Sequence, residues 1–488
     1  MASDIKFEQK PVDTADKVPV ITNWTPAIGY MLFQDDATTA SYYYYKLILE
    51  VRLDDATGTL LGKVKQRRNG YSDDVTNNKA RAFFDLRSII NSQLVDTVFD
   101  QNDSGVPFRA IHKVGANTAA KPFSVNGDRN TGETQLQTVY VKGYQEYATT
   151  QTASPTVITT DTVNDTQYYI GASLPLMTER DDDGDYIQGT AFQVHQGKGA
   201  TDKLLSDLQT SAGDYNISGY INYVQDTDYH TVGFLNNTSL FSSDIHNILI
   251  KYYDNAGSLI GGSTHAIENN TTNGGANPGT EADTDAERLI YFGCGPANLE
   301  AQSITASAKP SNNSGWAYYT ISGAATSGES YALRSDSYYF IKQDGSCKGF
   351  KVRRLAWRNS LGCYDYFNFK MKSTQTINVS RNNYNTMLGT FNKSKWRYNN
   401  TQRGKKTRQT TAILKETLNT DWITEQDATL LEKLIMSTDV YVVENSDTDY
   451  TEPVMIADTS LIRKTSANNK MIQYTINIEY ANPINTNS

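Results

Sequence analysis

Strict alternation of apolar and polar residues is the strongest local signal in this chain. Over residues 43–53 every second position is apolar, namely Tyr43, Tyr45, Leu47, Leu49, Val51 and Leu53. A period of two is typical of a strand with one buried face, because successive side chains point to opposite sides of a sheet. Turn-forming residues at 54–58 and a second strand pattern over 60–67 complete a predicted β-hairpin.

Further strand patterns recur through the rest of the chain. Apolar and aromatic runs bounded by turn residues predict strands over residues 229–235, 248–253, 289–292, 350–357, 363–370 and 440–443. Residues 254–257 predict a turn back through 258–260, and Gly362 suits a loop position with positive φ. The chain ends in a predicted half-buried strand, with apolar residues alternating at Ile472, Tyr474, Ile476, Ile478 and Tyr480.

Helical patterns are few and short. Thr424 and Asp427 have the spacing of a capping box, and apolar positions recur on one helical face behind them, which predicts a helix over residues 425–436. Asp85 is placed to cap a second short helix, whose apolar positions are Leu86, Ile89, Ile90 and Leu94.

The length of 488 residues predicts more than one domain, since single cores rarely organise so long a chain. We expect an N-terminal β domain over residues 1–150, whose first 40 residues form a loosely ordered leading arm. A middle β domain follows over 151–345, with a mobile surface loop at 268–286, and a C-terminal β domain spans 346–488. The Thr/Ser-rich segment 148–165 at the first boundary is either a linker or an edge strand containing proline.

Composition supports an all-β fold. Only 38% of the residues are hydrophobic, but 32 Tyr and 16 Phe supply large rings that can fill a core. Abundant Thr, Asn, Ser, Asp and Tyr are the bias of sheets joined by turns. The sequence therefore predicts a multi-domain all-β protein of sandwich-like or barrel-like domains, with one short helix near residues 425–436.

Charge and targeting signals limit the partners. The net charge is −9 with a pI near 5.2, which disfavours nucleic acid and anionic membranes as partners of the whole chain. No apolar run approaches the roughly 20 residues of a membrane span, and the polar start lacks the pattern of a signal peptide. We expect a protein of the cytosol, or of particles assembled there, with Cys294, Cys347 and Cys363 as free thiols.

No motif points to catalysis or to a cofactor. The five histidines lie apart from one another and from the cysteines, so each is interpreted as a surface or core residue: His112, His195, His230, His246 and His265. There is no nucleophile elbow, P-loop or dinucleotide-binding glycine motif. Cys294 stands between glycines but has no local base, so a buried thiol beside a turn is favoured over a nucleophile. The sequence predicts a protein that is not an enzyme and holds neither metal nor cofactor.

An acidic loop at residues 179–185 partly matches the pattern of a calcium-binding loop. Glu179 and the run 181–185 place carboxylates at alternating positions before a glycine, as calcium-binding loops do. The twelfth position counted from Glu179 is Thr190, where such a loop needs a bidentate glutamate. A solvated acidic turn is therefore the favoured interpretation.

A basic stretch stands out against the acidic chain. Seven cations fall within sixteen residues without an acid among them, beside Trp396 and Tyr398: Lys393, Lys395, Arg397, Arg403, Lys405, Lys406 and Arg408. Such a stretch could contact nucleic acid through phosphates and base stacking. A basic strap that docks on an acidic surface of a neighbouring copy is the favoured alternative, and a solvated hairpin is the third.

Three segments carry a resemblance to a known class of proteins: FFDLRSII at 83–90, LAWRNSLGCYDYF at 355–367, and WITEQD at 422–427 followed by STDVY at 437–441. These segments, and the order in which they occur, resemble virion structural proteins of tailed bacteriophages. The resemblance is to tail, baseplate and collar components found in phages of Bacteroidetes-like hosts. Cys363 departs from the pattern, because a second glycine is expected there. The resemblance implies an architectural role and transfers no functional site.

The sequence thus predicts a homo-oligomeric ring or adaptor whose partners are copies of itself and other virion proteins. Two alternatives remain, a receptor-binding tail protein that holds host glycan and a polysaccharide depolymerase. Candidate structural or subunit-contact residues lie in the second resembling segment: Trp357, Asn359, Gly362, Asp365, Tyr366 and Phe367. Aromatic anchors supply much of the energy of such interfaces. Burial in the core is the favoured interpretation of Trp357 and the aromatic strand.

Overall fold

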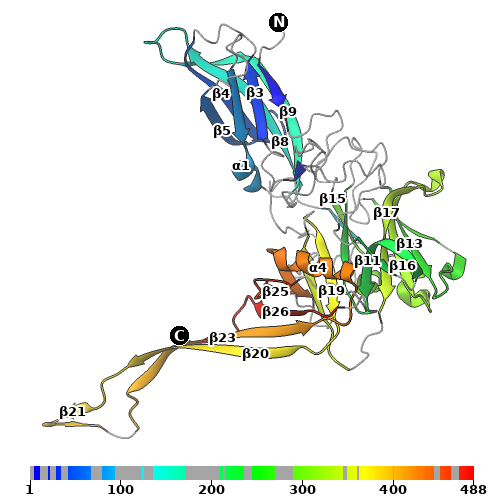
Figure 1. The fold of residues 1–488 in the computed structure, drawn as a ribbon, viewed down its shortest axis with the longest axis vertical. Coiled ribbons are helices and arrows are strands. Elements are labelled where there is room, and N and C mark those ends of the chain that lie inside the picture. The colour runs from blue at the N-terminus through cyan, green and yellow to red at the C-terminus, as the bar shows by residue number, and fades with distance from the viewer. Residues whose placement is uncertain are drawn as a thin grey trace. The chain divides into compact units, whose positions relative to one another are not determined.

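The computed structural model describes residues 5–10, 20–21, 29–34, 42–67, 80–93, 122–125, 136–170, 206, 209–212, 215–235, 245–262, 264–270, 289–343, 349–359, 362–398, 401–443, 451–462 and 472–487. The protein is mostly β-sheet, as predicted (Figure 1). Its α-helices in these ranges are α1 (Arg87–Asn91), α3 (Pro296–Ala301) and α4 (Glu425–Met436). Two compact units can be separated: residues 1–342 with 359–365, and residues 343–358 with 366–488.

The first part of unit 1 is a sandwich of two sheets. One contains β1 (Ile5–Gln9), β3 (Gly29–Gln34) and β6 (Ala80–Asp85). The other contains β2 (Val20–Ile21), β9 (Thr156–Ile170), β8 (Leu136–Ala148), β4 (Tyr43–Leu53) and β5 (Leu60–Arg67), in that spatial order. The predicted hairpin is confirmed as β4 and β5. The alternating side chains Tyr45, Leu47, Leu49 and Val51 of β4 are buried against residues of the smaller sheet such as Leu32 and Phe84.

Two sequence expectations about this sandwich need correction. The described parts of the expected leading arm are strands of the fold, since β1 pairs with β3 and Ile5 lies in the core. Apolar residues at alternate positions in short strands gave too weak a pattern to be seen in the sequence. Residues 149–155 form the turn between β8 and β9, which pair in one sheet, so residue 150 is no break in this sandwich. Of the two alternatives for 148–165, the strand holds for residues 156–165, which belong to β9, whereas Pro155 lies in the turn before the strand.

The short helix after β6 forms without the expected cap. Its N-cap residue is Leu86, which makes no side-chain cap hydrogen bond. Asp85 instead accepts a hydrogen bond from the backbone N–H of Arg87 at 3.0 Å and pairs with the Arg87 guanidinium. Asp85 thus lies one residue before the N-cap. Its carboxylate still satisfies one backbone N–H of the first turn that has no partner within the helix.

The second part of unit 1 joins a three-stranded and a six-stranded sheet around one core. The first contains β12 (Thr231–Leu235), β15 (Leu289–Gly293) and β7 (Phe123–Val125). The second contains β10 (Gln209–Ala212), β11 (Ile217–Val224), β17 (Leu333–Lys342), β16 (Tyr318–Ala324), β13 (Asn247–Tyr253) and β14 (His265–Glu268). Short 3-10 turns at Ile260–Gly262, Ala306–Ala308, Pro310–Asn312 and Ser327–Glu329 connect them. Phe234 and Phe292 meet Tyr338 and Phe340 in the core. The predicted loop 268–286 lies mostly outside the described residues.

Unit 2 is built on one eight-stranded sheet. Its members are β19 (Tyr364–Phe369), β18 (Arg353–Arg358), β24 (Val440–Val443), β25 (Thr451–Ile456), β26 (Thr475–Tyr480), β23 (Lys405–Asn419) and β20 (Thr374–Asn385), in that order, with β27 (Asn485–Asn487) beside β23. A two-stranded ribbon of β21 (Thr390–Asn392) and β22 (Lys395–Arg397) joins β20 to β23. The alternation at the chain end is confirmed, because Ile472, Tyr474, Ile476, Ile478 and Tyr480 are all buried.

The predicted helix over residues 425–436 is confirmed as α4. Thr424 accepts a hydrogen bond from the Asp427 N–H, and the Asp427 carboxylate accepts one from the Thr424 N–H, which completes the capping box. Leu431 and Leu434 are buried on one face. Unit 2 begins at Gln343, close to the boundary expected at 345/346. The division into three domains stays a prediction.

Candidate protein-interaction hairpin

Potential metal-ligating side chains lie apart in the described ranges of the chain. Within these ranges, no three His, Cys, Asp or Glu side chains lie close enough together to hold a metal ion. His230 is buried and packs edge-on against Phe340, with ring centroids 5.0 Å apart. Burial lowers the pKa of His265, which disfavours its charged form. His112, His195 and the acidic loop at 179–185 lie outside the described residues.

Two of the three cysteines are buried thiols that form no disulfide. Cys294 follows β15 at the turn before α3, and its thiol points to the carbonyl oxygen of His230 at 3.5 Å. Cys363 lies against Tyr291, with its sulfur 3.8 Å from the phenol oxygen. Both agree with the interpretation as buried thiols, and Cys347 lies outside the described residues.

The candidate contact residues around β18 and β19 are mostly internal. Trp357, Asn359, Gly362, Asp365 and Tyr366 are buried, and Phe367 is half-buried. Gly362 has φ +86°, as predicted, and its N–H donates to the Asn359 carbonyl oxygen at 3.1 Å. The structure favours the core interpretation of this segment. Buried side chains of this kind hold the hairpin together and offer little area to a partner.

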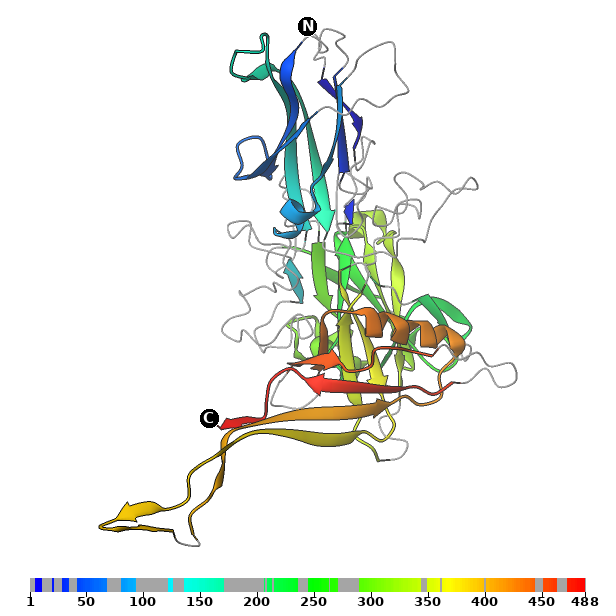
Figure 2. The same ribbon diagram turned by 60° about the vertical axis from the view of Figure 1, so that its left-hand side comes forward.

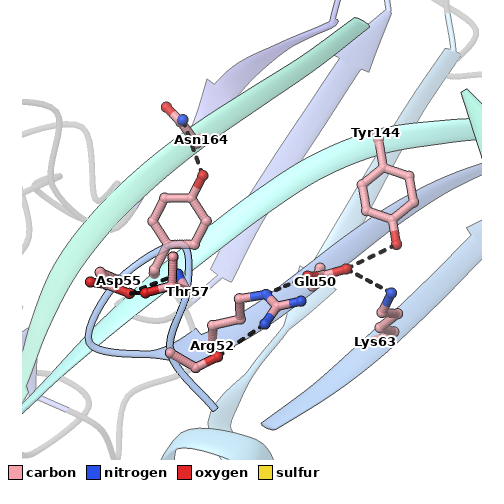
Figure 3. Close-up of polar contacts among 9 residues, drawn as sticks. Glu50, Arg52, Asp55, Thr57, Lys63, Tyr144 and Asn164 are labelled. Atoms are coloured by element: carbon pink, nitrogen blue, oxygen red, sulfur yellow. Dashed lines mark hydrogen bonds and ion pairs between the residues drawn. The ribbon is translucent and has the colours of Figure 1, made fainter. Parts of the chain in front are cut away.

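A polar cluster lies on the sheet formed by β4, β5 and β8 (Figure 3). Glu50 accepts hydrogen bonds from Arg52 Nε at 2.5 Å and from Tyr144 at 3.3 Å, and it pairs with Lys63 Nζ at 2.7 Å. Burial alone would raise the pKa of Glu50, but the hydrogen bonds from Lys63 and Arg52 outweigh it and lower the pKa. Because Glu50 pairs with Lys63 on the neighbouring strand β5 and with Arg52 two residues along β4, we interpret the cluster as an element that stabilises the sheet.

A long exposed structure in the described part of unit 2 is the hairpin of β20 and β23 with its β21–β22 end, residues 374–415, which we call the basic hairpin. Both ribbon views show it extending away from the other strands of its sheet (Figures 1 and 2). All twelve residues of β20 are exposed. At about 3.4 Å per residue, this strand alone spans on the order of 40 Å. Strand β23 pairs with β26 only over Lys415–Asn419.

The two faces of the basic hairpin differ. In the register of β20 and β23, Ile377 lies opposite Leu414, and Val379 lies opposite Ala412. Directly opposed residues share one face of a sheet, and these four form what we call the apolar stripe. The exposed fraction is 58% for Ile377 and 43% for Val379. The other face carries polar side chains at most positions: Thr376, Asn378, Ser380 and Thr411.

The apolar stripe continues the buried face of unit 2. Glu416 and Leu418, two and four residues beyond Leu414 on β23, point to the same side and are buried. Leu418 lies opposite the buried Ile476. The core-facing side of the sheet therefore runs on past the end of the core and becomes exposed to solvent.

The end of the hairpin combines aromatic and apolar side chains with positive charge. Phe391 pairs with Trp396 across the β21–β22 ribbon, and both side chains are exposed, as are Met387 and Tyr398. The Trp396 indole N–H donates to the Leu388 carbonyl oxygen at 2.9 Å, which fixes its ring on the hairpin. The seven cations singled out in the sequence are all exposed in this outer half. The structure brings them together on one hairpin.

The root of the hairpin is clamped by a buried carboxylate, Glu416 on β23. It accepts hydrogen bonds from Arg353 Nε at 2.9 Å, from Gln375 at 3.2 Å and from Tyr480 at 2.8 Å. Burial would raise the pKa of Glu416, but these hydrogen bonds outweigh it and lower the pKa. The clamp ties β23 to β18, β20 and β26, so the hairpin leaves the sheet from a fixed base.

Sequence reasoning found the cations and left a solvated hairpin open as the third interpretation, but it missed the apolar stripe. Alternation at Ile377 and Val379, matched by Ala412 and Leu414, was the signal available. The absence of any acidic residue from 366 to 415 was a second signal.

None of the helices in the described part of the chain is long and apolar enough to cross a membrane. Searches against models of known protein families and against curated protein sequences find no match.

Proposed function

We propose that this chain is a structural subunit of a tailed-bacteriophage virion, in which copies assemble into a ring or adaptor of the tail, baseplate or collar. The observation that carries the proposal is the basic hairpin, a long exposed ribbon with an uncovered apolar stripe near its root and cations with aromatic rings at its end. In this role the chain acts through contacts with copies of itself and with other virion proteins, and performs no catalysis.

A long exposed ribbon of this kind is unfavourable in isolation. A two-stranded hairpin without a covering layer is marginally stable in water. Burying its exposed apolar side chains against another surface is favourable by about 25 cal/mol for each Å² of apolar area removed from water. A contiguous exposed apolar patch edged by polar residues marks a binding surface. Beyond the stretch Thr410–Ala412, where β27 pairs with β23, the basic hairpin is a two-stranded ribbon. Ile377 and Val379 of its apolar stripe are exposed, and its clamped root presents it in one direction.

The composition of the hairpin fits a protein partner. Aromatic side chains and arginine are enriched in the centres of protein interfaces, where they supply most of the binding energy. Trp396, Phe391 and Tyr398 lie beside Arg397 at the end of the hairpin. An assembling subunit needs such anchors at its surface, and the all-β domains supply a rigid base for them.

The test is the mass of the purified chain in solution. Sedimentation velocity and mass photometry should show a self-associated species of defined size, and negative-stain electron micrographs should show closed particles. Replacing Lys405, Lys406 and Arg408 together by Gln should shift the population toward the monomer. Added salt should act in the same direction, because the Debye length falls to about 10 Å at 0.1 M.

A matched control carries the same loss of charge elsewhere. Lys6→Gln, Arg67→Gln and Lys372→Gln together remove three exposed cations outside the outer half of the hairpin. This control should assemble like the parent. A parent chain that stays monomeric at low salt and at high concentration would refute the proposed function.

A further inference from the structure

Charge is segregated along this chain to an unusual degree. The basic hairpin holds nine Lys and Arg and no acid, so its formal charge is +9. The rest of the chain then holds 36 Lys and Arg against 54 Asp and Glu, a formal charge of −18. Two such hairpins laid side by side repel each other, whereas a hairpin and the remainder of another copy attract.

We infer that the basic hairpin of one copy docks head-to-tail on the hairpin-free part of the next copy, rather than on the hairpin of a partner. This inference rests on the proposed function. It specifies that the contact is head-to-tail and joins the hairpin of one copy to the hairpin-free part of the next. The occupant of the apolar stripe is thus the acidic remainder of a second, identical chain. The cations at the end of the hairpin steer the encounter, and the stripe and the aromatic rings supply the buried contact area.

The geometry of the root supports a repeating contact of this polarity. The Glu416 clamp joins β23 to β18, β20 and β26, so every copy presents its hairpin from the same base. A head-to-tail contact uses two different surfaces on each copy and leaves one of each free at the ends of a chain of copies. Such a contact closes into a ring when its rotation divides the full circle.

A shortened chain separates the two surfaces. Register places Arg381 opposite Thr410, so replacing residues 382–409 by Asn-Gly closes the hairpin with a two-residue turn suited to antiparallel strands. The shortened chain loses the seven clustered cations and the aromatic end, and keeps the root, the sheet and the whole acidic remainder. It can receive a hairpin but has lost the outer half with which to donate one.

The experiment is a capture assay with purified, nuclease-treated protein at low salt. A tagged shortened chain is immobilised and offered either the untagged parent or an untagged shortened chain. We expect the parent to be retained and the shortened chain to be lost in the wash. In solution, the shortened chain should also cap the assemblies of the parent and reduce their mass.

A second variant tests the apolar stripe without shortening the chain. Ile377→Ser with Val379→Ser removes exposed apolar side chains, so folding should persist. Its capture by the shortened chain should weaken about tenfold, as truncation of interface anchors typically does. The control is Asn378→Ala with Ser380→Ala on the polar face, which should be captured like the parent.

Each other outcome overturns the inference in a distinct way. If the parent assembles in solution but is not retained by the shortened chain, the contact joins two hairpins, and the proposed function survives alone. If the shortened chain retains itself, the contact does not use the hairpin. A parent that neither assembles nor is retained refutes both proposals. If the parent is retained only when nuclease treatment is omitted, and it shows salt-sensitive DNA binding that the shortened chain lacks, the hairpin is assigned to nucleic acid.

Discussion

Replacing Glu416 by Gln should loosen the root of the basic hairpin by about 3 kcal/mol. The Glu416 side chain is 1% exposed and its carboxylate pairs with Arg353, whose side chain is also largely buried. Removing one partner of a buried ion pair typically costs about 3–5 kcal/mol, because the other charge stays in a poorly solvated place. We take the lower end, since Gln keeps the shape of the side chain and can still accept the hydrogen bond from Tyr480.

A matched control lies on the same pair of strands. Glu479 pairs with Lys415 at 2.7 Å, but both side chains are partly exposed. Exposed pairs contribute about 0–1 kcal/mol, so Glu479→Gln should change the stability little. The two substitutions remove the same charge from adjacent rungs of the ladder between β23 and β26. Their difference therefore measures the effect of burial.

Hydrogen exchange followed by mass spectrometry is a suitable assay, because it reports opening of individual segments. Peptides from β23 and β26 should exchange on the order of 100-fold faster in Glu416→Gln, and less than about fivefold faster in Glu479→Gln, since each factor of ten corresponds to about 1.4 kcal/mol. Equal, small effects of the two substitutions would refute the clamp.

The pH dependence gives an independent check. The pKa of Glu416 is lowered in the folded state, so its carboxylate stabilises the fold fully above the unfolded pKa of about 4.3. That contribution is lost as the pH falls through the lower, folded pKa. The difference between parent and Glu416→Gln should therefore shrink below about pH 4. A difference that grows on acidification would contradict the assigned sign.

Two further predictions concern unit 2. Ile476 on β26 is 0% exposed, so Ile476→Asp should destabilise the fold by roughly 4 kcal/mol or more, because it buries an unpaired charge. Thr475→Asp on the exposed face should destabilise it far less. Similar urea midpoints for the two variants would show the assigned face to be wrong. Thr424→Ala removes the capping box of α4 and should destabilise unit 2 by about 1 kcal/mol, measured by thermal unfolding, with no change expected if the cap contributes nothing.

Local patterns decided which segments of this protein become strands and helices. The bounds of β4, β5, β24 and α4 agree with those predicted, because each carries a strong local signal: alternation over many residues, a run of β-branched side chains, or a capping box. The positive φ of Gly362 followed from its place between two strands. The seven cations were likewise evident from composition alone.

Tertiary structure decided everything that depends on partners distant in sequence. Strands β1 and β3 were missed because they are short, and they become strands by pairing with each other and with β6. The clamp at Glu416 joins residues from 353 to 480, a combination that no spacing rule predicts. The apolar stripe could be assigned only once the register of β20 and β23 placed Ile377 opposite Leu414. Local conformation depends on residues nearby in sequence, whereas exposure depends on what the rest of the chain covers. The described part of unit 2 leaves the apolar stripe of this hairpin exposed at Ile377 and Val379.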